Sequence, residues 1–326
     1  MLRLSSISAK ASIAGELRRL LPGAVSRDVP LSWISRWQIG GTADVVVRPR
    51  SIDELSKVRA WISGHGLAHM VIGETSNLLF ADEGLHVICV QMGSDFADVN
   101  IEGRRVEAQA GAWVPGFARR TMQAGLTGAE HIAGIPGALG GLVCMNGGSQ
   151  RKGIGSSIVQ VLSVDRAGHC VTRTRNECEF GYRKSVFQEN GEVIARATFE
   201  FDQAQDRAGV RREMLRILST RRKKFPRKQP NCGSVFKSDP AMYEDYGPPG
   251  EIIESLGWKG VRVGGAQVSN DHANFIINTG SATSKDVLTL ISRIRANVFS
   301  ETGYEMVPEV LFVDSSGRIT PATAEG

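Results

Sequence analysis

Glu309 lies in an apolar segment, where burial of a carboxylate costs free energy. It follows Pro308 within the otherwise apolar run Val307 to Val313. A charged group buried among apolar side chains loses its hydration, so a carboxylate there should face either solvent or a functional cleft. Glu309 is therefore either the outward residue of an edge strand or a candidate catalytic group.

Two further polar residues are candidates for chemistry on weaker grounds. Ser234 follows Cys232 and Gly233, which can form a tight turn, so its hydroxyl either donates a proton or caps the next element. Arg183 lies in G-Y-R-K-S, where its guanidinium can fork onto a carboxylate or a phosphate. Without further context, a surface turn is the simpler explanation for Arg183.

Two loops are suited to presenting backbone N–H groups to a ligand. The first is the glycine-rich segment Ala133 to Gly148, A-G-I-P-G-A-L-G-G-L-V-C-M-N-G-G. Small apolar residues stand between its glycines, which is typical of a packed segment and not of a flexible linker. It is either a crowded turn or a loop that lies against a ligand. The second is G-E-T-S-N, Gly73 to Asn77. Both can bind phosphate, but neither matches G-x-G-x-x-G before a helix, so we predict no Rossmann site.

Composition limits the class of protein. The chain has 326 residues, 41% of them hydrophobic and 22% charged, with a formal net charge of +5, which fits a globular protein with two or more cores. No apolar run reaches the about 18 residues of a membrane span, and no secretory signal is evident, so we expect a cytoplasmic protein. Its five cysteines include no C-x-x-C pair, which predicts reduced thiols and no metal site. The basic run Arg221 to Lys228 contains Phe225 as its one aromatic residue, so nucleic acid is not the predicted partner.

The apolar patterns predict interleaved strands and helices. Ser51 and Glu54 form a capping box for a helix that ends at Gly64. Further helices are predicted at Trp113 to Gln123, at Arg207 to Thr220, and from a cap near Ser284 to Gly303. Strands are predicted at 39–48, 70–72, 78–80, 86–91, 99–110, 158–164, 170–174, 193–201, 261–263 and 275–277. The three strands after the glycine-rich segment should form a largely antiparallel sheet.

Eight short segments, taken in order, carry a resemblance to a known family. They are G-G-T-A-D at Gly40 to Asp44, T-S-N at Thr75 to Asn77, G-I-P-G-A-L-G-G at Gly134 to Gly141, Y-R-K-S at Tyr182 to Ser185, C-G-S-V-F-K at Cys232 to Lys237, E-I-I-E-S-L-G-W-K-G at Glu251 to Gly260, H-A-N-F-I-I-N at His272 to Asn278, and P-E-V at Pro308 to Val310. The chain resembles the UDP-N-acetylenolpyruvoylglucosamine reductases (the MurB reductases) from about Arg36 to Val313. No Tyr-bearing insertion is evident, so it resembles the shorter form of the family.

The resemblance implies an α+β fold, with a two-lobed FAD-binding domain of the PCMH type followed by a C-terminal α/β substrate-binding domain. We expect an N-terminal extension at 1–32 and the FAD-binding domain at 33–205, with lobes at about 33–90 and 91–205. A helical linker with the basic segment follows at 206–228, and the substrate-binding domain at 229–326.

The resemblance also implies an activity. NADPH would reduce non-covalently bound FAD, and hydride would then pass to UDP-N-acetylglucosamine enolpyruvate, giving UDP-N-acetylmuramate for peptidoglycan synthesis in the bacterial cytoplasm. By motif, Ser234 resembles the proton donor, and Arg183 and Glu309 resemble the pair that polarises the substrate carboxylate. We expect no nucleic-acid or membrane partner, and a monomer or weak homo-oligomer.

The remaining site residues follow from the same motifs. The residues expected to bind FAD are Gly40, Gly41, Gly73, Thr75, Ser76, Asn77, Gly134, Ile135, Pro136, Gly137 and Gly141. Those expected to bind substrate are Tyr182, Lys224 and Lys237, and no residue is expected to bind a metal.

The chain departs from the family pattern at two places that bear on binding. The usual G-x-G-S-N loop is here G-E-T-S-N, with Glu74 beside the expected pyrophosphate, and the usual K-N-P is K-S-D-P at Lys237 to Pro240. Two alternatives therefore stay open. One is a divergent flavin reductase or oxidase that acts on another nucleotide sugar, and the other is a non-catalytic protein that binds nucleic acid through its basic segment.

Overall fold

A computed structural model describes residues 7–226 and 228–323, and its contacts divide the chain into two compact units. Unit 1 comprises Met1–Arg27, Val45–Glu74 and Ile88–Arg221, and unit 2 comprises Asp28–Asp44, Thr75–Val87 and Arg222–Gly326. The predicted boundaries follow chain order, whereas the structure groups 28–44 and 75–87 with the C-terminal part. The reason is strand pairing, because Leu78–Phe80 (β4) runs parallel to Leu311–Val313 (β16).

Residues 7–27 of the predicted N-terminal extension belong to unit 1, and several of them lie in its core. Helix α1 (Ile7–Leu20) contacts α2 (Ile52–Gly64). Ala14, Leu17 and Leu21 are fully buried. A strand that the sequence did not indicate, β1 (Val25–Pro30), follows and joins a sheet of order β1-β2-β5-β3, with β2 at Thr42–Val47, β5 at Leu85–Gln91 and β3 at His69–Ile72.

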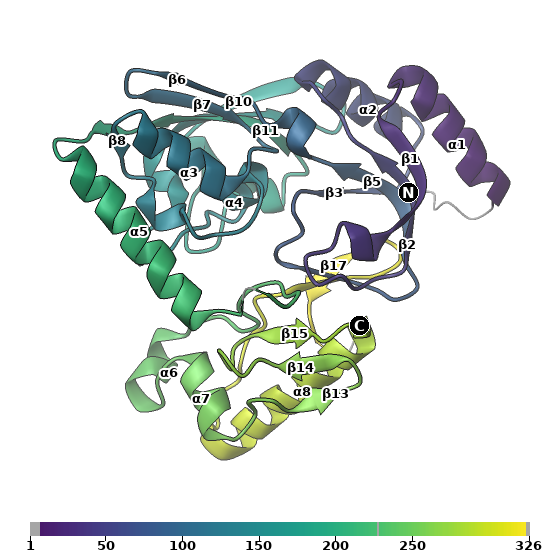
Figure 1. Ribbon diagram of the computed structural model, residues 1–326. Helices are drawn as coiled ribbons and strands as arrows, with labels where there is room; N and C mark the ends of the chain where they lie inside the picture. Colours follow the sequence, from purple (N-terminus) through teal and green to yellow (C-terminus); the bar gives the residue numbers. More distant parts are fainter. Residues whose placement is uncertain (1–6, 227, 324–326) are drawn as a thin grey trace. The chain divides into compact units, whose positions relative to one another are not determined.

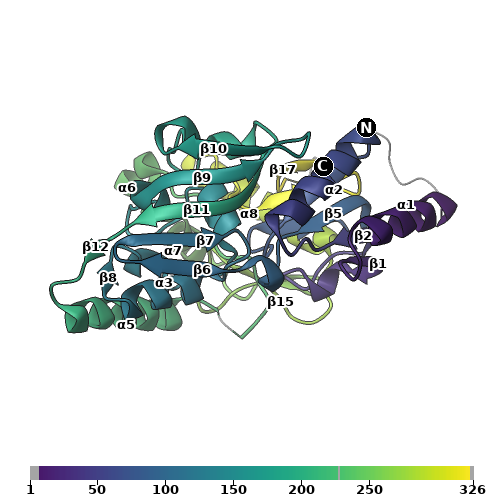
Figure 2. The same ribbon diagram turned by 90° about the horizontal axis from the view of Figure 1, so that it is seen from above.

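The antiparallel sheet predicted after the glycine-rich segment is confirmed, and it is wider than expected. Its order is β10-β9-β11-β7-β6, which Figure 2 shows side by side. The strands are β6 (Val99–Glu102), β7 (Arg105–Gln109), β9 (Ile158–Val164), β10 (Cys170–Thr174) and β11 (Val193–Glu200). The single strand predicted at 99–110 is thus a hairpin, because Gly103 turns the chain at φ +59°.

Helices cover the face of this sheet and continue the chain toward unit 2. Helix α4 (Leu139–Cys144) contacts β7 and β11, and α3 (Val114–Gln123) packs through Phe117 against Phe199 of β11. Beyond a short pairing of β8 (Leu126–Thr127) with β12 (Asp202–Gln203), α5 (Arg207–Lys224) extends four residues past its predicted end and absorbs part of the basic run. None of the helices in the described part of the chain is long and apolar enough to cross a membrane.

Unit 2 is a small sheet and a long helix with short helices around them. Strands β13 (Arg262–Val263), β14 (Ala266–Val268) and β15 (Ile276–Asn278) form a sheet that α8 (Ser284–Thr302) covers, as Figure 1 shows. Thr283 caps α8, one residue before the predicted cap, and Gly303 ends it at φ +74°. Helices α6 (Pro240–Asp245) and α7 (Pro249–Ser255) were not predicted. Strand β16 lies between β4 and β17 (Ile319–Pro321).

A buried arginine and a histidine join three segments of unit 1. Arg59 of α2 is 2% exposed, and its Nη1 donates to His69 Nε2 at 2.5 Å while its Nη2 donates to the Gly191 carbonyl at 2.7 Å. Since a guanidinium only donates, the imidazole must accept through an unprotonated nitrogen. Burial, together with the nearby Arg59 charge, lowers the pKa of His69 to about 4.

This contact predicts an acid-sensitive step in stability. The unfolded chain binds a proton at His69 near pH 6.5 and the folded chain near pH 4, so stability present above pH 6.5 is lost as pH falls toward 4. The variant His69→Gln keeps an acceptor for Arg59. When the pH falls from 7.5 to 5, we expect the unfolding free energy of the parent to decrease by about 1 to 2 kcal/mol more than that of His69→Gln. Urea unfolding at both values measures this. The exposed His169→Gln is the control, and equal pH dependence of His69→Gln and the parent would contradict the prediction.

Candidate functional site

Ser234 and Glu309 lie on two neighbouring segments of unit 2 that pair through their backbones. The Val235 carbonyl accepts from the Glu309 N–H at 2.7 Å, and Lys237 N donates to the Val307 carbonyl at 2.9 Å. Phe236 and Pro308 form a bridge between these two contacts. The structure therefore brings together two of the three residues predicted to be catalytic, although 74 positions (309 minus 235) separate the bonded pair in sequence. Both side chains are half-buried.

The turn that carries Ser234 is built as the sequence predicts. Asn231 Oδ1 accepts from Gly233 N at 3.0 Å, and Gly233 has φ +82°, a conformation that glycine adopts without strain. Cys232 is 3% exposed, and its thiol donates to the carbonyls of Thr75 at 3.4 Å and Leu78 at 3.5 Å. Burial raises the pKa of Cys232 to about 12, so the thiol stays protonated and keeps donating. Cys232 thus anchors the Ser234 turn on the T-S-N loop.

The T-S-N loop holds its own shape through Thr75. Thr75 is 4% exposed and has φ +51°, which is rare for a β-branched residue. Its hydroxyl donates to the Ile34 carbonyl at 2.9 Å and accepts from Arg36 N at 3.1 Å, and these bonds offset the backbone strain. The hydroxyl is therefore engaged by the chain. Ser76 is half-buried, and Glu74 is exposed.

Gly40 and Gly41 are required by packing within unit 2. A Cβ on Gly40, at φ +121°, would lie 2.9 Å from Phe80 Cβ, and one on Gly41 would overlap the Asp82 carbonyl. The Asp82 carboxylate in turn accepts from the Ser284 N–H and hydroxyl, both at 2.8 Å, at the start of α8. Contacts within the chain explain both glycines, so their predicted contact with FAD stays a prediction.

In the glycine-rich segment of unit 1, different structural constraints apply at different glycines. A Cβ on Gly134 would overlap the Arg221 side chain, one on Gly140 would lie 2.8 Å from Ala110 Cβ, and Gly137 has φ +149°. Gly141 is exposed, and a Cβ there would meet no atom of the described chain within 4 Å. The segment is thus crowded at Gly134 and Gly140 and open at Gly141.

These features fit a bound FAD. The Gly73 loop reaches the segment, because a Cβ on Gly73 would lie 3.0 Å from Ala138 Cβ. The half-buried guanidinium of Arg221 beside Gly134 adds positive charge, and burial lowers its pKa from the usual value. An open glycine and a cation suit a pyrophosphate. Ile135 packs against the core, and Pro136, like Ile135, is half-buried, so their predicted contact with FAD is untested.

Arg183 and Tyr182 form the tip of a tight hairpin in unit 1. Gly181 and Lys184 exchange backbone hydrogen bonds at 3.0 and 3.2 Å, and Arg183 has φ +54°. The base of the hairpin is fixed to the end of α4, because Ser185 Oγ donates to the Cys144 carbonyl at 2.5 Å and Asn146 Nδ2 donates to the Gly181 carbonyl at 2.8 Å. Tyr182 is 75% exposed. The structure therefore ties the predicted Arg183 to the glycine-rich segment.

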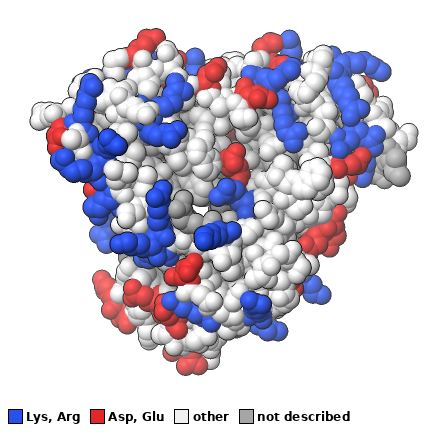
Figure 3. Space-filling view, in the orientation of Figure 1, with Lys and Arg blue, Asp and Glu red and all other residues white. Residues whose placement is uncertain are grey.

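Lys224 of unit 2 takes part in a basic cluster that the sequence only partly indicated. The neighbouring Phe225 stacks on Phe275 at 4.9 Å and lies 5.4 Å from the His272 ring. Burial, together with the charges of Lys224 and Lys259, lowers the pKa of His272 to about 4. The ammonium group of Lys259 is also paired with Glu254, with its Nζ 2.6 Å from Glu254 Oε1. Figure 3 shows Lys and Arg side chains gathered over α5, which ends at Lys224.

The remaining predicted substrate residue, Lys237, is exposed beside Val307. The K-S-D-P departure that follows it has a structural explanation, because the Asp239 carboxylate accepts from Ala241 N at 3.0 Å and caps α6.

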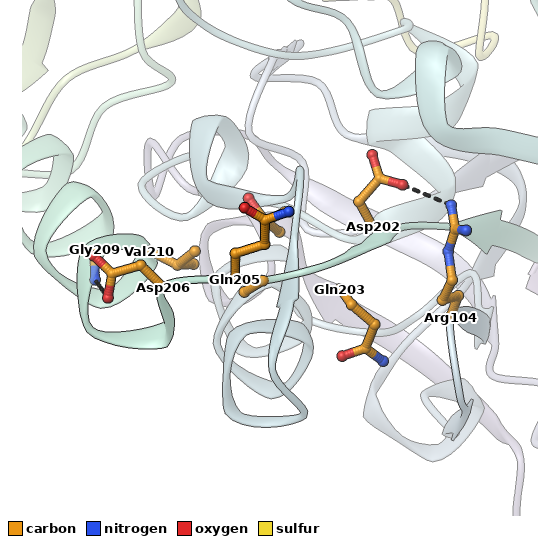
Figure 4. A pocket seen from close by; sticks show the side chains of 9 residues that line it. Arg104, Asp202, Gln203, Gln205, Asp206, Gly209 and Val210 are labelled. Carbon is orange, nitrogen blue, oxygen red and sulfur yellow. Dashed lines mark hydrogen bonds and ion pairs between the residues drawn. The ribbon is translucent and has the colours of Figure 1, made fainter.

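A shallow hollow of about 690 Å³ in unit 1 lies apart from all these residues. Figure 4 shows that polar side chains line it, with Arg104 paired to Asp202 and with Gln203 and Gln205 beside them. None of the predicted site residues lines it. No group of three His, Cys, Asp or Glu side chains within residues 7–226 and 228–323 is placed to hold a metal ion.

Comparison with known proteins identifies the class. The family model described as FAD binding domain matches residues 43–174, and the one described as UDP-N-acetylenolpyruvoylglucosamine reductase, C-terminal domain, matches residues 225–313. An FAD-binding domain followed by this C-terminal domain defines a flavin-dependent oxidoreductase, and it confirms the predicted α+β architecture.

The curated relatives and a solved structure identify the family. UDP-N-acetylenolpyruvoylglucosamine reductase 1 of Corynebacterium glutamicum is 43% identical over 95% of this chain and 92% of its own length. The reductase of Moorella thermoacetica is 38% identical over 92% and 96%. The crystal structure of the Thermus caldophilus reductase (MurB) matches with a TM-score of 0.75 and 28% identity, covering 88% of this chain and 98% of that one. The chain belongs to the UDP-N-acetylenolpyruvoylglucosamine reductase family.

Sequence reasoning missed three residues that the structure places in or beside the site. Asn146 and Lys259 lie within segments that the patterns singled out, but no spacing rule connects them with Gly181 or His272. Cys232 belongs to the C-G-S-V-F-K segment, but no sequence pattern indicates that its thiol donates to carbonyls of the T-S-N loop and β4.

The two adjacent glycines of α4 give a matched test of the cofactor prediction. Gly140→Ala should destabilise the protein by about 1 to 3 kcal/mol, because the new methyl group meets Ala110. Gly141→Ala should leave stability unchanged or raise it by up to about 1 kcal/mol, since alanine favours helix. If FAD lies against Gly141, this variant should bind FAD about tenfold more weakly, which costs about 1.4 kcal/mol. Thermal unfolding of the apoprotein and flavin fluorescence titration measure the two effects, and unchanged FAD affinity in Gly141→Ala would remove Gly141 from the cofactor site.

Proposed function

We propose that this chain is an NADPH-dependent flavoenzyme that reduces UDP-N-acetylglucosamine enolpyruvate to UDP-N-acetylmuramate in the bacterial cytoplasm. The observation that carries the proposal is the pairing of the Ser234 and Glu309 segments through the Val235 carbonyl, in a C-terminal domain of the reductase family. It acts as a monomer or weak homo-oligomer, without a nucleic-acid or membrane partner.

Bound FAD supplies hydride transfer, with NADPH as the source of electrons. The residues that would hold it are the backbone of Gly73 and of the T-S-N loop together with Gly134, Ile135, Pro136, Gly137 and Gly141. Gly141 leaves open space and Arg221 supplies positive charge, which supports their place beside a pyrophosphate.

Ser234 delivers a proton and the two charged residues act on the carboxylate side. Addition of hydride to the vinyl carbon leaves negative charge on the neighbouring carbon and its carboxylate. Arg183 and Glu309 polarise that carboxylate, so preorganised polar groups are already in place when the negative charge develops. The Ser234 hydroxyl then protonates the carbon that bears the charge. A serine hydroxyl is a weak acid, so its effect depends on its position and on that charge, and the turn at Asn231 and Gly233 fixes the position.

The substrate diphosphate has a suitable cationic partner at Lys224. Lys224 is exposed and its charge acts on the half-buried ring of His272, so it can present an ammonium group to an anion at this surface. Lys237 and Tyr182 are exposed and complete the proposed substrate contacts.

Ser234→Ala tests the chemical role directly. Flavin reduction by NADPH should proceed within about twofold of the parent rate, whereas reoxidation by the enolpyruvyl substrate should fall by about 10² or more, because only the second step needs the proton. Anaerobic stopped-flow absorbance follows both steps. Ser300→Ala, an exposed serine on α8, is the control. Equal loss of both steps would argue against the acid role, and failure of the substrate to reoxidise the parent flavin would overturn the proposed activity.

Lys224→Met tests the diphosphate contact. We expect KM for the UDP-sugar to rise about tenfold with kcat within about twofold, since this contact is made equally in the ground state and the transition state. Lys285→Met, an exposed lysine of α8, should leave both constants unchanged. A fall in kcat with an unchanged KM would place Lys224 in the chemical step instead.

A further inference from the structure

Asn77 is the last residue of the T-S-N loop, directly before β4, and it holds the segment that carries Glu309. Its Nδ2 donates to the Glu309 carbonyl at 3.0 Å, although 232 positions separate the two residues. Its own carbonyl accepts from Leu311 N at 3.0 Å, at the point where β4 and β16 begin their parallel pairing. Asn77 therefore contacts the chain on both sides of Val310.

Glu309 is held at both of its peptide groups. Its N–H donates to the Val235 carbonyl at 2.7 Å, on the side of the Ser234 turn, and its carbonyl accepts from Asn77. The segment between the bridge at Pro308 and the start of β16 at Leu311 has no strand partner of its own. The N–H of the same peptide, Val310 N, donates to the Val235 carbonyl only at 3.5 Å, so the 3.0 Å bond from the Asn77 amide is the shorter of the two contacts that orient this peptide plane.

The loop that presents Asn77 is itself stiff. Thr75 keeps φ +51° through two hydrogen bonds of its hydroxyl, and the Thr75 carbonyl receives the buried thiol of Cys232. One loop therefore contacts the segment of Ser234 through its carbonyl and the segment of Glu309 through an amide. A displacement of this loop would move both residues.

From this geometry we propose that Asn77 is a positioning residue for Glu309, so that its side chain serves the substrate half-reaction in addition to any contact with the cofactor. The proposal rests on the catalytic role proposed above for Glu309. Asn77 does not touch the reacting atoms in this role. It sets the direction in which the Glu309 side chain leaves the backbone.

Asn77→Asp separates positioning from cofactor binding. The substitution keeps the size and one acceptor oxygen but replaces the donating Nδ2 by an oxygen that repels the Glu309 carbonyl. We expect reoxidation of the flavin by the enolpyruvyl substrate to slow by about tenfold or more, as small misplacements of catalytic groups do. FAD affinity is measured separately by fluorescence titration, and the substrate step is compared at saturating FAD with the rate of reduction by NADPH as the reference. Asn176→Asp, an exposed residue of unit 1, controls for the added charge.

A double-mutant cycle with Glu309→Gln identifies the path of the effect. If Asn77 acts through Glu309, the double variant should reoxidise no more slowly than Glu309→Gln alone, within about threefold. Asn77→Ala, which removes the donor without adding charge, repeats the cycle if the aspartate variant folds poorly. Far-ultraviolet circular dichroism and the flavin spectrum report folding of each variant.

Each outcome decides the proposal. Losses of rate that multiply in the double variant would overturn the positioning role, since the two residues would then act independently. A fall in FAD affinity with an unchanged substrate step would also overturn it and leave Asn77 as a cofactor residue only. A parent protein that the substrate cannot reoxidise would instead overturn the proposed function on which the role depends. Non-additive losses confined to the substrate step support it.

Discussion

The site in unit 2 depends on one backbone contact, between the Val235 carbonyl and the Glu309 N–H. It joins the Ser234 turn to the segment before β16, which is far from it in the chain, and neither segment lies within a helix or a named strand. Asn274 supports the pair from a third segment. Its Oδ1 accepts from Phe236 N at 2.9 Å and its Nδ2 donates to the Phe236 carbonyl at 3.0 Å. Because Asn274 is 5% exposed, these bonds act where an unmade one would be costly. Buried polar contacts of Asn274 thus support the backbone bridge between Phe236 and Pro308 at this site.

Packing explains part of the glycine-rich segment, and contact with a ligand stays a prediction for Gly141. Packing accounts for Gly134 and Gly140, since each lies where a methyl group would meet Arg221 or Ala110. Gly141 has no such neighbour in the described chain, so packing does not account for it. Crowding on one side of the segment is what keeps the other side at a fixed place, and a fixed backbone is what a phosphate needs from its N–H groups. The ligand contact proposed at Gly141 would therefore use the rigidity that this crowding provides.

The sequence predicted elements whose signals are local and missed those that depend on distant partners. The helix after Ser51, the helix ended by Gly303 and the antiparallel sheet were all predicted, because caps and apolar periods mark them directly. Helices α4, α6 and α7 have six or seven residues, which is too short for an apolar period to appear. The same limit applies to the site. A motif placed Ser234 and Glu309, but no pattern indicates that Asn77 bonds to Glu309 across 232 positions.

At both departures from the family pattern, a hydrogen bond between a side chain and the backbone fixes the local geometry. Where the family usually has the second glycine of G-x-G-S-N, this chain has Thr75, and the backbone still adopts a positive φ. The hydroxyl makes this possible, because its bonds to Ile34 and Arg36 offset the strain that a glycine would not have. In K-S-D-P, Asp239 caps α6 in place of the usual asparagine. In both cases the side chain has changed, and a hydrogen bond to the backbone fixes the local geometry. The path of the backbone around Asn77 and Lys237, more than the identity of each motif residue, is therefore what presents the functional groups.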